Sequence, residues 1–330
     1  MSQMKARTFI VLVASFCLCY SCTVDGYLEN KIAGEALGTT YHITYLGEAN
    51  EAIVDGIDSI IAEVNHSLST YSSASFISAF NDNREFDPNY TDVKHFNYMV
   101  SLSNEISLAT NGAFDPSASR LFSLYDRSKK DGVEMNRDEV ENCLRHQGLR
   151  LLTLNEDRYE KNDSLFSLNF NAIAKGYLVD LLAEYFEVLG YERYMIEVGG
   201  EMRVKGNNKE NQLWRVGVNI PDVDADPSSF YTVLELENVS VATSGNYQNY
   251  YYLDGELIGH TINPKTGKPV INTLKSASII HDDCAVADAY ATACMVLGTD
   301  SARDLVEENI NLSAYLIYEL DGKLVGEFVE

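Results

Sequence analysis

Residues 165–190 read LFSLNFNAIAKGYLVDLLAEYFEVLG, and this stretch indicates the class of fold. We expect a strand over residues 165–170. Apolar side chains then recur at helical spacing, at Leu178, Leu181, Leu182, Tyr185 and Leu189. Gly190 follows the last of them and is suited to end a helix. The stretch therefore predicts a strand that leads directly into an amphipathic helix.

The flanking sequence predicts further strands and helices that do not alternate strictly. Helices are expected over 53–64, 92–110, 137–146 and 285–297, with an exposed loop over 126–138. Strands are expected over 36–46, 194–198, 214–219, 231–236, 240–243 and 276–280, with hairpin turns at 254–255 and 321–322. This order predicts one α+β or mixed α/β domain and not a doubly wound sheet.

The charge balance limits the classes of partner. The chain has 330 residues, and its 25 Lys and Arg against 49 Asp and Glu give a formal net charge of -24. Binding to a nucleic-acid backbone requires a basic surface, so we expect no nucleic-acid partner. The same charge opposes any anionic ligand, and phosphate chemistry here would need a metal ion or well-placed cations.

The N-terminal sequence predicts export and lipid attachment. Lys5 and Arg7 precede an apolar run over residues 8–20, which is too short to span a membrane but suits a signal peptide. Ser21 and Cys22 follow it and resemble the cleavage site of a bacterial lipoprotein, although Cys19 departs from the usual pattern. An ordinary signal peptide that is cut nearby is the alternative.

These features predict the domain boundaries and the location. We expect a lipoprotein signal peptide over residues 1–21, a tether over 22–31 that begins at the lipidated Cys22, and one folded domain over 32–330. The protein would be anchored by lipid at a membrane of a bacterial cell envelope, facing the periplasm. Cys143, Cys284 and Cys294 have no metal-type spacing, and we expect them to be small buried residues.

Asp288 and Thr292 are candidate ligands of a metal ion. They are four residues apart on a predicted helix, so the carboxylate and the hydroxyl face the same way. Both are hard oxygen ligands that suit Mg²⁺. The alternative is a tightly packed, alanine-rich helix on which Thr292 bonds its own backbone and Asp288 is solvated.

Lys175 and His260 are candidate contacts to an anionic ligand. Lys175 lies in the first turn of the predicted helix, where a cation opposes the helix dipole and free N–H groups favour an anion. Its alternative is a solvated lysine. His260 ends a strand before a turn over 264–267, and a structural histidine is its alternative.

The order of short motifs along the chain is more specific than any one of them. The motifs are LGTT at 37–40, LSTY at 68–71, GAFDP at 112–116, NAIAKG at 171–176, EVGGE at 197–201, ATSG at 242–245, HTINP at 260–264 and ADAYAT at 287–292. In this order they resemble the ApbE family of flavin transferases, and the resemblance covers residues from about 32 to the C-terminus.

The resemblance implies a fold, a reaction and a set of site residues. It implies one large T-fold-like domain that splits FAD, attaches FMN to a threonine of an acceptor protein and releases AMP. Mg²⁺ would be held by Asp288, Thr292 and the backbone carbonyl of Ala172, and the catalytic set would be Lys175, His260 and Asp288. The FAD contacts would be Leu37, Tyr71, Ala113, Phe114, Asp115, Asn169, Lys175 and His260.

Elementary chemistry agrees with this assignment, although some residues depart from the family pattern. Mg²⁺ and Lys175 could together hold the pyrophosphate, and the rings of Tyr71 and Phe114 could stack on FAD. His260 could act as a base or could position phosphate. Leu37 replaces the commoner Met, residues 171–172 replace Gly-Gly, and Asn169 replaces a common Asp.

Three alternative functions remain open at this point. The same site could use water as the nucleophile and act as a periplasmic FAD pyrophosphatase. The protein could instead be a flavin-binding lipoprotein without catalysis, or a surface lipoprotein that binds glycans or peptides. For the transferase we expect an acceptor that is a membrane redox subunit or a secreted flavoprotein with a target threonine.

Overall fold

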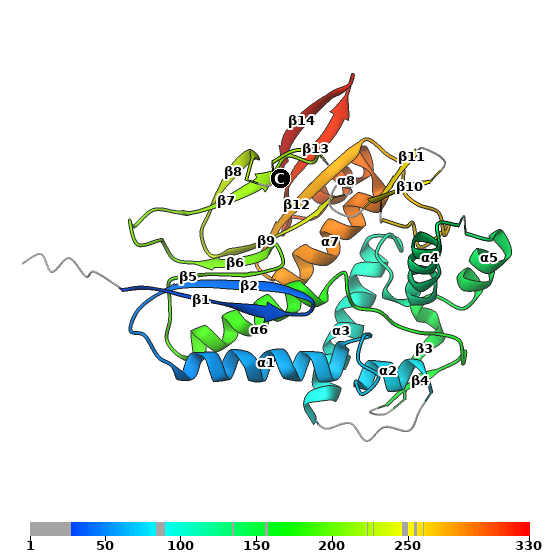
Figure 1. Cartoon of the computed structure of the whole chain (residues 1–330), viewed down its shortest axis with the longest axis horizontal. Helices are drawn as coiled ribbons and strands as arrows, with labels where there is room; N and C mark the ends of the chain where they lie inside the picture. The colour runs from blue at the N-terminus through cyan, green and yellow to red at the C-terminus, as the bar shows by residue number, and fades with distance from the viewer. Residues whose placement is uncertain are drawn as a thin grey trace, which may run out of the picture.

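The computed structural model describes residues 28–83, 90–133, 135–155, 158–222, 224–226, 228–245, 250–253, 256–259 and 261–330, and it centres on one antiparallel sheet (Figure 1). The sheet has eight strands in the order β1-β2-β5-β6-β9-β12-β13-β14. These strands are β1 (Glu29–Ala36), β2 (Thr39–Leu46), β5 (Tyr194–Val198), β6 (Glu201–Lys205), β9 (Val239–Gly245), β12 (Leu274–His281), β13 (Ser313–Leu320) and β14 (Lys323–Val329). The prediction of a mixed α/β domain that is not doubly wound is confirmed.

Helices α6 and α7 pack on one face of the sheet, and α1 and α3 pack outside them (Figure 1). The helices are α1 (Ala52–Leu68), α2 (Phe76–Asn81), α3 (Tyr90–Ala109), α4 (Ser119–Asp131), α5 (Arg137–Arg145), α6 (Ala174–Val188), α7 (Cys284–Leu297) and α8 (Thr299–Glu307). Short 3₁₀ turns cover Pro116–Ala118 and Leu149–Leu151. Separate hairpins are β3 (Leu152–Asn155) with β4 (Arg158–Lys161), β7 (Trp214–Asn219) with β8 (Phe230–Leu236), and β10 (Tyr250–Leu253) with β11 (Glu256–Gly259).

Both faces of the sheet are covered by apolar side chains. On the helical face, alternate residues of β5 (Tyr194, Ile196 and Val198) are fully buried in the main core. On the other face, the β7–β8 hairpin packs Trp214 and its apolar neighbours against the sheet in a second, smaller cluster. The sheet is therefore a rigid, two-sided platform, and its loops and the helix N-termini beside them are free to form a site.

The prediction of a strand over residues 165–170 is wrong. This segment has no regular secondary structure beyond a turn at Leu165, and it belongs to no sheet. The Asn81 side chain replaces a neighbouring strand, because its Nδ2 donates to the Leu168 carbonyl and its Oδ1 accepts from the Leu168 N–H, each at 2.8 Å. A side-chain amide thus satisfies the backbone groups that a strand partner would otherwise bond.

The segment over residues 36–46 is a hairpin and not a single strand. Leu37 and Gly38 form the turn between β1 and β2 with φ angles of 50° and 78°, in the left-handed region. Strand β1 begins at Glu29, so the last three residues of the expected tether (29–31) pair with β2, from Glu29↔Leu46 onward. The turn places Leu37 at the end of the hairpin.

Residues 126–138 do not form a single loop as predicted. The helix α4 extends to Asp131, with Gly132 as its left-handed C-cap, and α5 begins at Arg137. The apolar side chains of Leu121, Leu124 and Tyr125 pack one face of α4 into a local core. The charged face of that helix is exposed, and this charge made the sequence resemble a loop.

The remaining helix and strand predictions over the described residues are confirmed with shifts of a few residues. Strand β6, the β3–β4 hairpin and helices α2 and α8 were not predicted, and the turn predicted at residues 254–255 lies outside the described residues. Cys143, Cys284 and Cys294 are free and buried, as expected.

Among the described residues no helix is both long and apolar enough to span a membrane. Residues 1–27, which include the predicted signal peptide and Cys22, lie outside the described part of the chain.

Helices α6 and α7 approach each other at backbone distance. Gly176, in the first turn of α6, faces the first residues of α7. A methyl group at Gly176 would lie 2.4 Å from the carbonyl oxygen of Cys284 and 2.9 Å from the Cα atom of Ala285. Only a residue without a side chain fits here. This contact fixes how the N-termini of the two helices lie relative to each other.

We expect Gly176→Ala to lower the free energy of unfolding by about 1 to 3 kcal/mol, because the new methyl group would overlap backbone atoms that cannot move independently. Urea denaturation measures this loss. Gly56→Ala in α1 is the matched helical control: its methyl group would meet the hydroxyl and the adjoining ring edge of Tyr185, which belong to a side chain that can rotate away and not to backbone. A Gly176→Ala protein as stable as this control would contradict the packing described.

Candidate active site

A cavity of about 640 Å³ opens where α6, α7 and the ends of several strands meet. Its lining includes every predicted site residue that the structure describes, namely Leu37, Tyr71, Ala113, Phe114, Asp115, Asn169, Ala172, Lys175, Asp288 and Thr292. His260 lies outside the described residues. Residues more than 250 positions apart in sequence therefore share one cavity, as the ordered motifs implied.

Asp288 is held in the cavity wall by the neighbouring helix. Its side chain is buried, and its Oδ2 accepts a hydrogen bond from the backbone N–H of Gly176 at 3.1 Å. The alternative of a solvated Asp288 is therefore wrong. Thr292 lies one turn later on α7, with its hydroxyl 3.5 Å from the Ser244 hydroxyl of β9. Asp288 and Thr292 both line the cavity from α7.

Lys175 forms an ion pair with Glu201 across the cavity wall. Burial alone would lower the pKa of Lys175, but the negative charges of Asp288 and Glu201 outweigh it and raise the pKa above its usual range. Burial and the charge of Asp288 raise the pKa of Glu201 to about 8, against the opposing effect of Lys175. Lys175 is thus a firmly charged ammonium group beside two carboxyl groups, and the alternative of a solvated lysine is wrong.

Glu201 is the principal site residue that sequence reasoning missed. Its side chain is 4 % exposed, and its Oε2 has no hydrogen-bond partner within the described structure. The residue closes the EVGGE motif, and the tight turn at Gly199 and Gly200, both with positive φ, brings it into the cavity. The two glycines after a strand were the available signal for a residue placed at a strand end.

Helix α4 adds a further wall that the sequence did not predict. Phe122, Tyr125, Asp126 and Lys129 line the cavity from this helix. None of these residues was a candidate: Asp126 and Lys129 fall in the segment expected to be an exposed loop, and no helix was predicted over Phe122 and Tyr125. The apolar spacing of Leu121, Leu124 and Tyr125 was the signal that could have identified the helix.

The two aromatic candidates differ in what they offer to a ligand. Tyr71 is 85 % exposed, and its hydroxyl accepts a hydrogen bond from Asn171 Nδ2 at 3.1 Å, which orients the ring at the cavity mouth. Phe114 is 3 % exposed and packs in the main core. Core packing therefore occupies most of the Phe114 side chain, although this residue also lines the cavity.

Asp115 and Asn169 shape the loops that surround the cavity. Asp115 Oδ1 accepts from the backbone N–H and the hydroxyl of Ser117, at 2.8 and 2.5 Å, and burial raises the pKa of this carboxyl group. Asn169 Oδ1 accepts from the Asn171 N–H at 2.8 Å and forms a tight turn. Both side chains hold backbone in place while a polar oxygen remains near the cavity.

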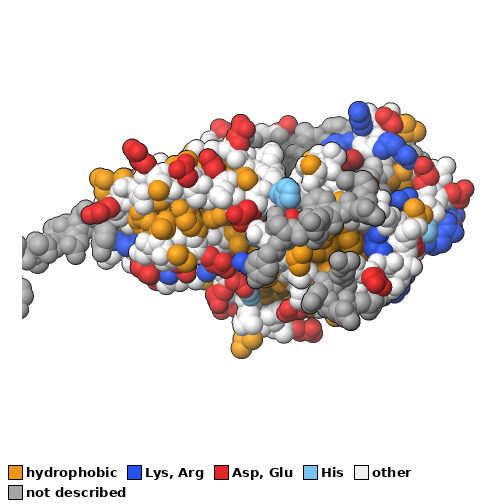
Figure 2. Space-filling view, turned by 90° about the horizontal axis from the view of Figure 1, so that it is seen from below, with side chains coloured by type: hydrophobic (Ala, Val, Ile, Leu, Met, Phe, Trp, Pro, Cys, Tyr) orange, Lys and Arg blue, Asp and Glu red, His pale blue; other side chains and the backbone are white. Residues whose placement is uncertain are grey.

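The cavity has an excess of negative charge. Four carboxyl groups line it (Asp115, Asp126, Glu201 and Asp288) against two ammonium groups (Lys129 and Lys175). The surface is also acidic: Figure 2 shows carboxylates over much of one face, whereas Lys and Arg gather toward the end where α4 and α5 lie. A ligand with two phosphate charges would meet net repulsion here unless a further cation came with it.

The comparisons with known proteins agree with one another. The model of the ApbE family matches residues 37–316. The FAD:protein FMN transferase of Vibrio cholerae is 31% identical over 311 residues, covering 92% of this chain and 91% of that protein. A solved structure of the flavin transferase ApbE from Vibrio cholerae has a TM-score of 0.80 at 28% identity, covering 92% of this chain and 98% of that one. The apo flavinyl transferase ApbE of Pseudomonas stutzeri has a TM-score of 0.78 at 26% identity, covering 92% and 95%.

The charge pattern predicts an asymmetry between two substitutions. Lys175→Met leaves Glu201 and Asp288 as two buried carboxyl groups without a cation. We expect it to cost roughly 3 kcal/mol of unfolding free energy, at the lower end for a buried pair because the lysine side chain is 30 % exposed. Glu201→Gln leaves one ammonium group facing Asp288 and should cost about 1 kcal/mol or less.

Denaturation of the ligand-free variants by urea, at neutral pH, compares the two losses directly. Methionine for lysine and glutamine for glutamate both nearly preserve the shape of the side chain, so the comparison reports mainly the loss of charge. A larger loss for Glu201→Gln than for Lys175→Met would contradict the view that the cavity has too few cations.

Proposed function

The chain belongs to the ApbE family, and we propose that it transfers the FMN part of FAD to a threonine hydroxyl of an acceptor protein, with Mg²⁺ as the metal ion. The proposal rests above all on one observation: Lys175 on α6 and Asp288 and Thr292 on α7 line the same cavity. This is the charge arrangement that cleavage of a pyrophosphate requires.

The residues present fit a divalent cation. Glu201 has a buried carboxylate oxygen without a partner, and the cavity holds two more carboxyl groups than ammonium groups. Asp288, Thr292 and the backbone carbonyl of Ala172 would supply hard oxygen ligands, and water and phosphate would complete the coordination of Mg²⁺. When bound, the ion would neutralise the charge that develops on the phosphate oxygens.

The side chains of the site would divide the remaining tasks. Lys175 would bind a pyrophosphate oxygen, and Glu201 would keep the ammonium group directed into the cavity. Tyr71, at the cavity mouth, would stack on a ring of FAD, while Leu37, Ala113 and Phe114 would form the wall against which the dinucleotide lies. Asp115 and Asn169 would hold the loops that shape this wall.

The reaction exchanges one bond to phosphorus for another. The acceptor threonine oxygen would form a bond to the FMN phosphorus, and the bond from this phosphorus to the bridging oxygen would break. AMP would leave with the electron pair of that bond. We propose His260 as the base that takes the threonine proton, which leaves Lys175 to stabilise the leaving phosphate.

The proposed setting follows from the N-terminal sequence. Residues 1–21 would be removed as a signal peptide, Cys22 would receive lipid, and the domain would lie at a membrane of the cell envelope facing the periplasm. The acceptor would be a membrane redox subunit or a secreted flavoprotein that carries the target threonine. We expect no nucleic-acid partner, because the net charge of -24 opposes binding to a phosphate backbone.

An acceptor protein incubated with the enzyme, FAD and Mg²⁺ should gain one FMN on threonine, seen by intact mass spectrometry. We expect Asp288→Asn to slow this labelling roughly 100-fold, because it removes a charged ligand of the metal ion. Asp300→Asn on α8 is the matched control, since Asp300 is an exposed carboxylate that is not part of the cavity lining.

Two results would change the proposal in different ways. Equal labelling rates for Asp288→Asn and wild type would remove Asp288 from the metal site. Release of free FMN and AMP with no mass added to the acceptor would instead identify a pyrophosphatase that uses water as its nucleophile.

A further inference from the structure

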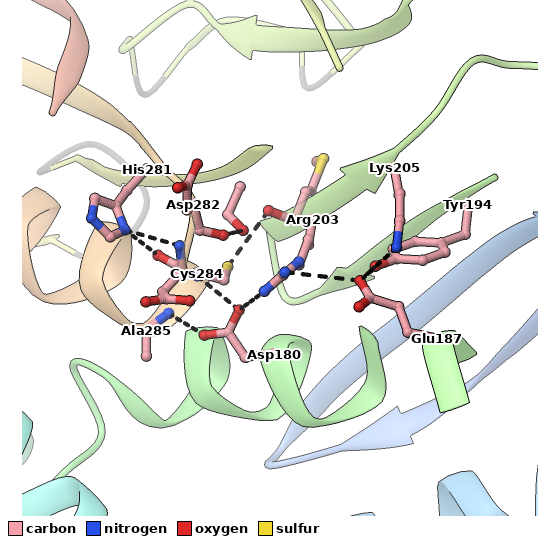
Figure 3. A network of polar contacts seen from close by, with 12 residues as sticks. Asp180, Glu187, Tyr194, Arg203, Lys205, His281, Asp282, Cys284 and Ala285 are labelled. Carbon is pink, nitrogen blue, oxygen red and sulfur yellow. Dashed lines mark hydrogen bonds and ion pairs between the residues drawn. The ribbon is translucent and has the colours of Figure 1, made fainter. Parts of the chain in front are cut away.

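The N-terminus of α7 is capped by a residue of another helix. Asp283, at the N-cap position of α7, makes no capping hydrogen bond with its side chain. Asp180 of α6 replaces it: Oδ1 accepts from the Cys284 N–H at 2.9 Å, and Oδ2 accepts from the Ala285 N–H at 2.8 Å (Figure 3). One carboxylate from α6 thus binds two of the free N–H groups that begin α7.

Asp180 is itself held from the sheet. Arg203 of β6 donates from Nη1 to Asp180 Oδ1 at 3.0 Å, and its second terminal nitrogen, Nη2, lies 3.9 Å from Glu187 Oε1 (Figure 3). Glu187 in turn accepts from the Tyr194 hydroxyl at 2.7 Å and pairs with Lys205 at 3.4 Å. Since Asp180 is 6 % exposed and bonded on both oxygens, its carboxylate has one available position.

The two helices exchange carboxylates in a reciprocal arrangement. Asp180 on α6 binds the first N–H groups of α7, whereas Asp288 on α7 binds the N–H of Gly176 near the start of α6. Each carboxylate lies four residues after the backbone group that its own helix contributes, at Gly176 and Cys284, so the two contacts occupy adjacent turns. Displacement of one contact would displace the other.

We propose that Asp180 is a positioning residue for the transfer reaction: by fixing the N-terminus of α7, it sets the place of the Asp288 carboxylate and the Thr292 hydroxyl in the cavity. Asp180 is absent from the cavity lining, so it acts through α7 and not on the substrate. The inference rests on the proposed function, in which these two side chains hold a divalent cation.

The charges of the cavity explain why such a fixed point is needed. Asp288 and Glu201 are both buried and line the same cavity, where four carboxyl groups face two ammonium groups, so like charges repel there before a cation binds. A helix free to shift would relieve this repulsion by moving Asp288 away. The cap by Asp180 and the Gly176 contact oppose that movement and keep the oxygen ligands in place for the ion.

The test compares Asp180→Asn with wild type in binding of Mn²⁺, measured by electron paramagnetic resonance with FAD present and no acceptor. We expect about 10-fold weaker Mn²⁺ binding, because residues that contact metal ligands from outside act mainly on the affinity for the metal. In a separate labelling reaction with acceptor and saturating metal, the KM for FAD should change less than about two-fold. Glu327→Gln is the matched control: it neutralises a carboxylate paired with Arg303 at 2.8 Å, on β14, outside the cavity lining.

Arg203→Lys provides a second variant that keeps both the charge and the Asp180 cap. It loses the forked geometry of the guanidinium group, so we expect the same change at smaller size, about 3-fold weaker Mn²⁺ binding. If Asp180→Asn does not fold, this variant still tests the inference.

The outcomes separate the inference from the proposed function. Absence of Mn²⁺ binding to wild type would refute the proposed metal site. Wild-type binding that both variants retain at full strength, with only their melting temperatures lowered, would overturn the inference and leave Asp180 as a structural cap.

Discussion

The contact between the backbones of α6 and α7 at Gly176 is the constraint on which the site depends. Lys175 directly precedes this glycine, and Asp288 bonds to its N–H at 3.1 Å. The close approach of the two helices therefore places an ammonium group and a carboxylate in one cavity. A side chain at position 176 would separate the helices and, with them, the two charges.

The sheet supplies charged groups that contact both helices. Strand β6 contributes Glu201 to the cavity, and the next alternate residue on this strand, Arg203, fixes Asp180 at the start of α7. One short strand thus holds both helices through charged groups, and the apolar cores on either side of the sheet make it rigid. Rigid elements hold charged groups in fixed positions, so these groups do not have to reorganise when a ligand binds.

The sequence predicted the site better than it predicted the chain path around it. Asp288, Thr292 and Lys175 could be found because helical spacing and a helix start are local properties. Glu201 could not, because its place depends on how β6 pairs within the sheet. The strand expected over residues 165–170 failed for a similar reason, since the Asn81 side chain, far away in sequence, takes the part of a strand. Helix α4 was not predicted because its C-terminal half is rich in charged residues, and its apolar face is stabilised by packing into a local core.

We propose that a divalent cation completes the charge balance between α6 and α7. A crystal of the protein soaked with Mn²⁺ and FAD tests it most directly, through the anomalous scattering of manganese. We expect one strong anomalous peak in the cavity, about 2.0 to 2.3 Å from oxygens of Asp288, Thr292 and the Ala172 carbonyl. A cavity that contains FAD but no such peak, with Lys175 alone against the pyrophosphate, would contradict it.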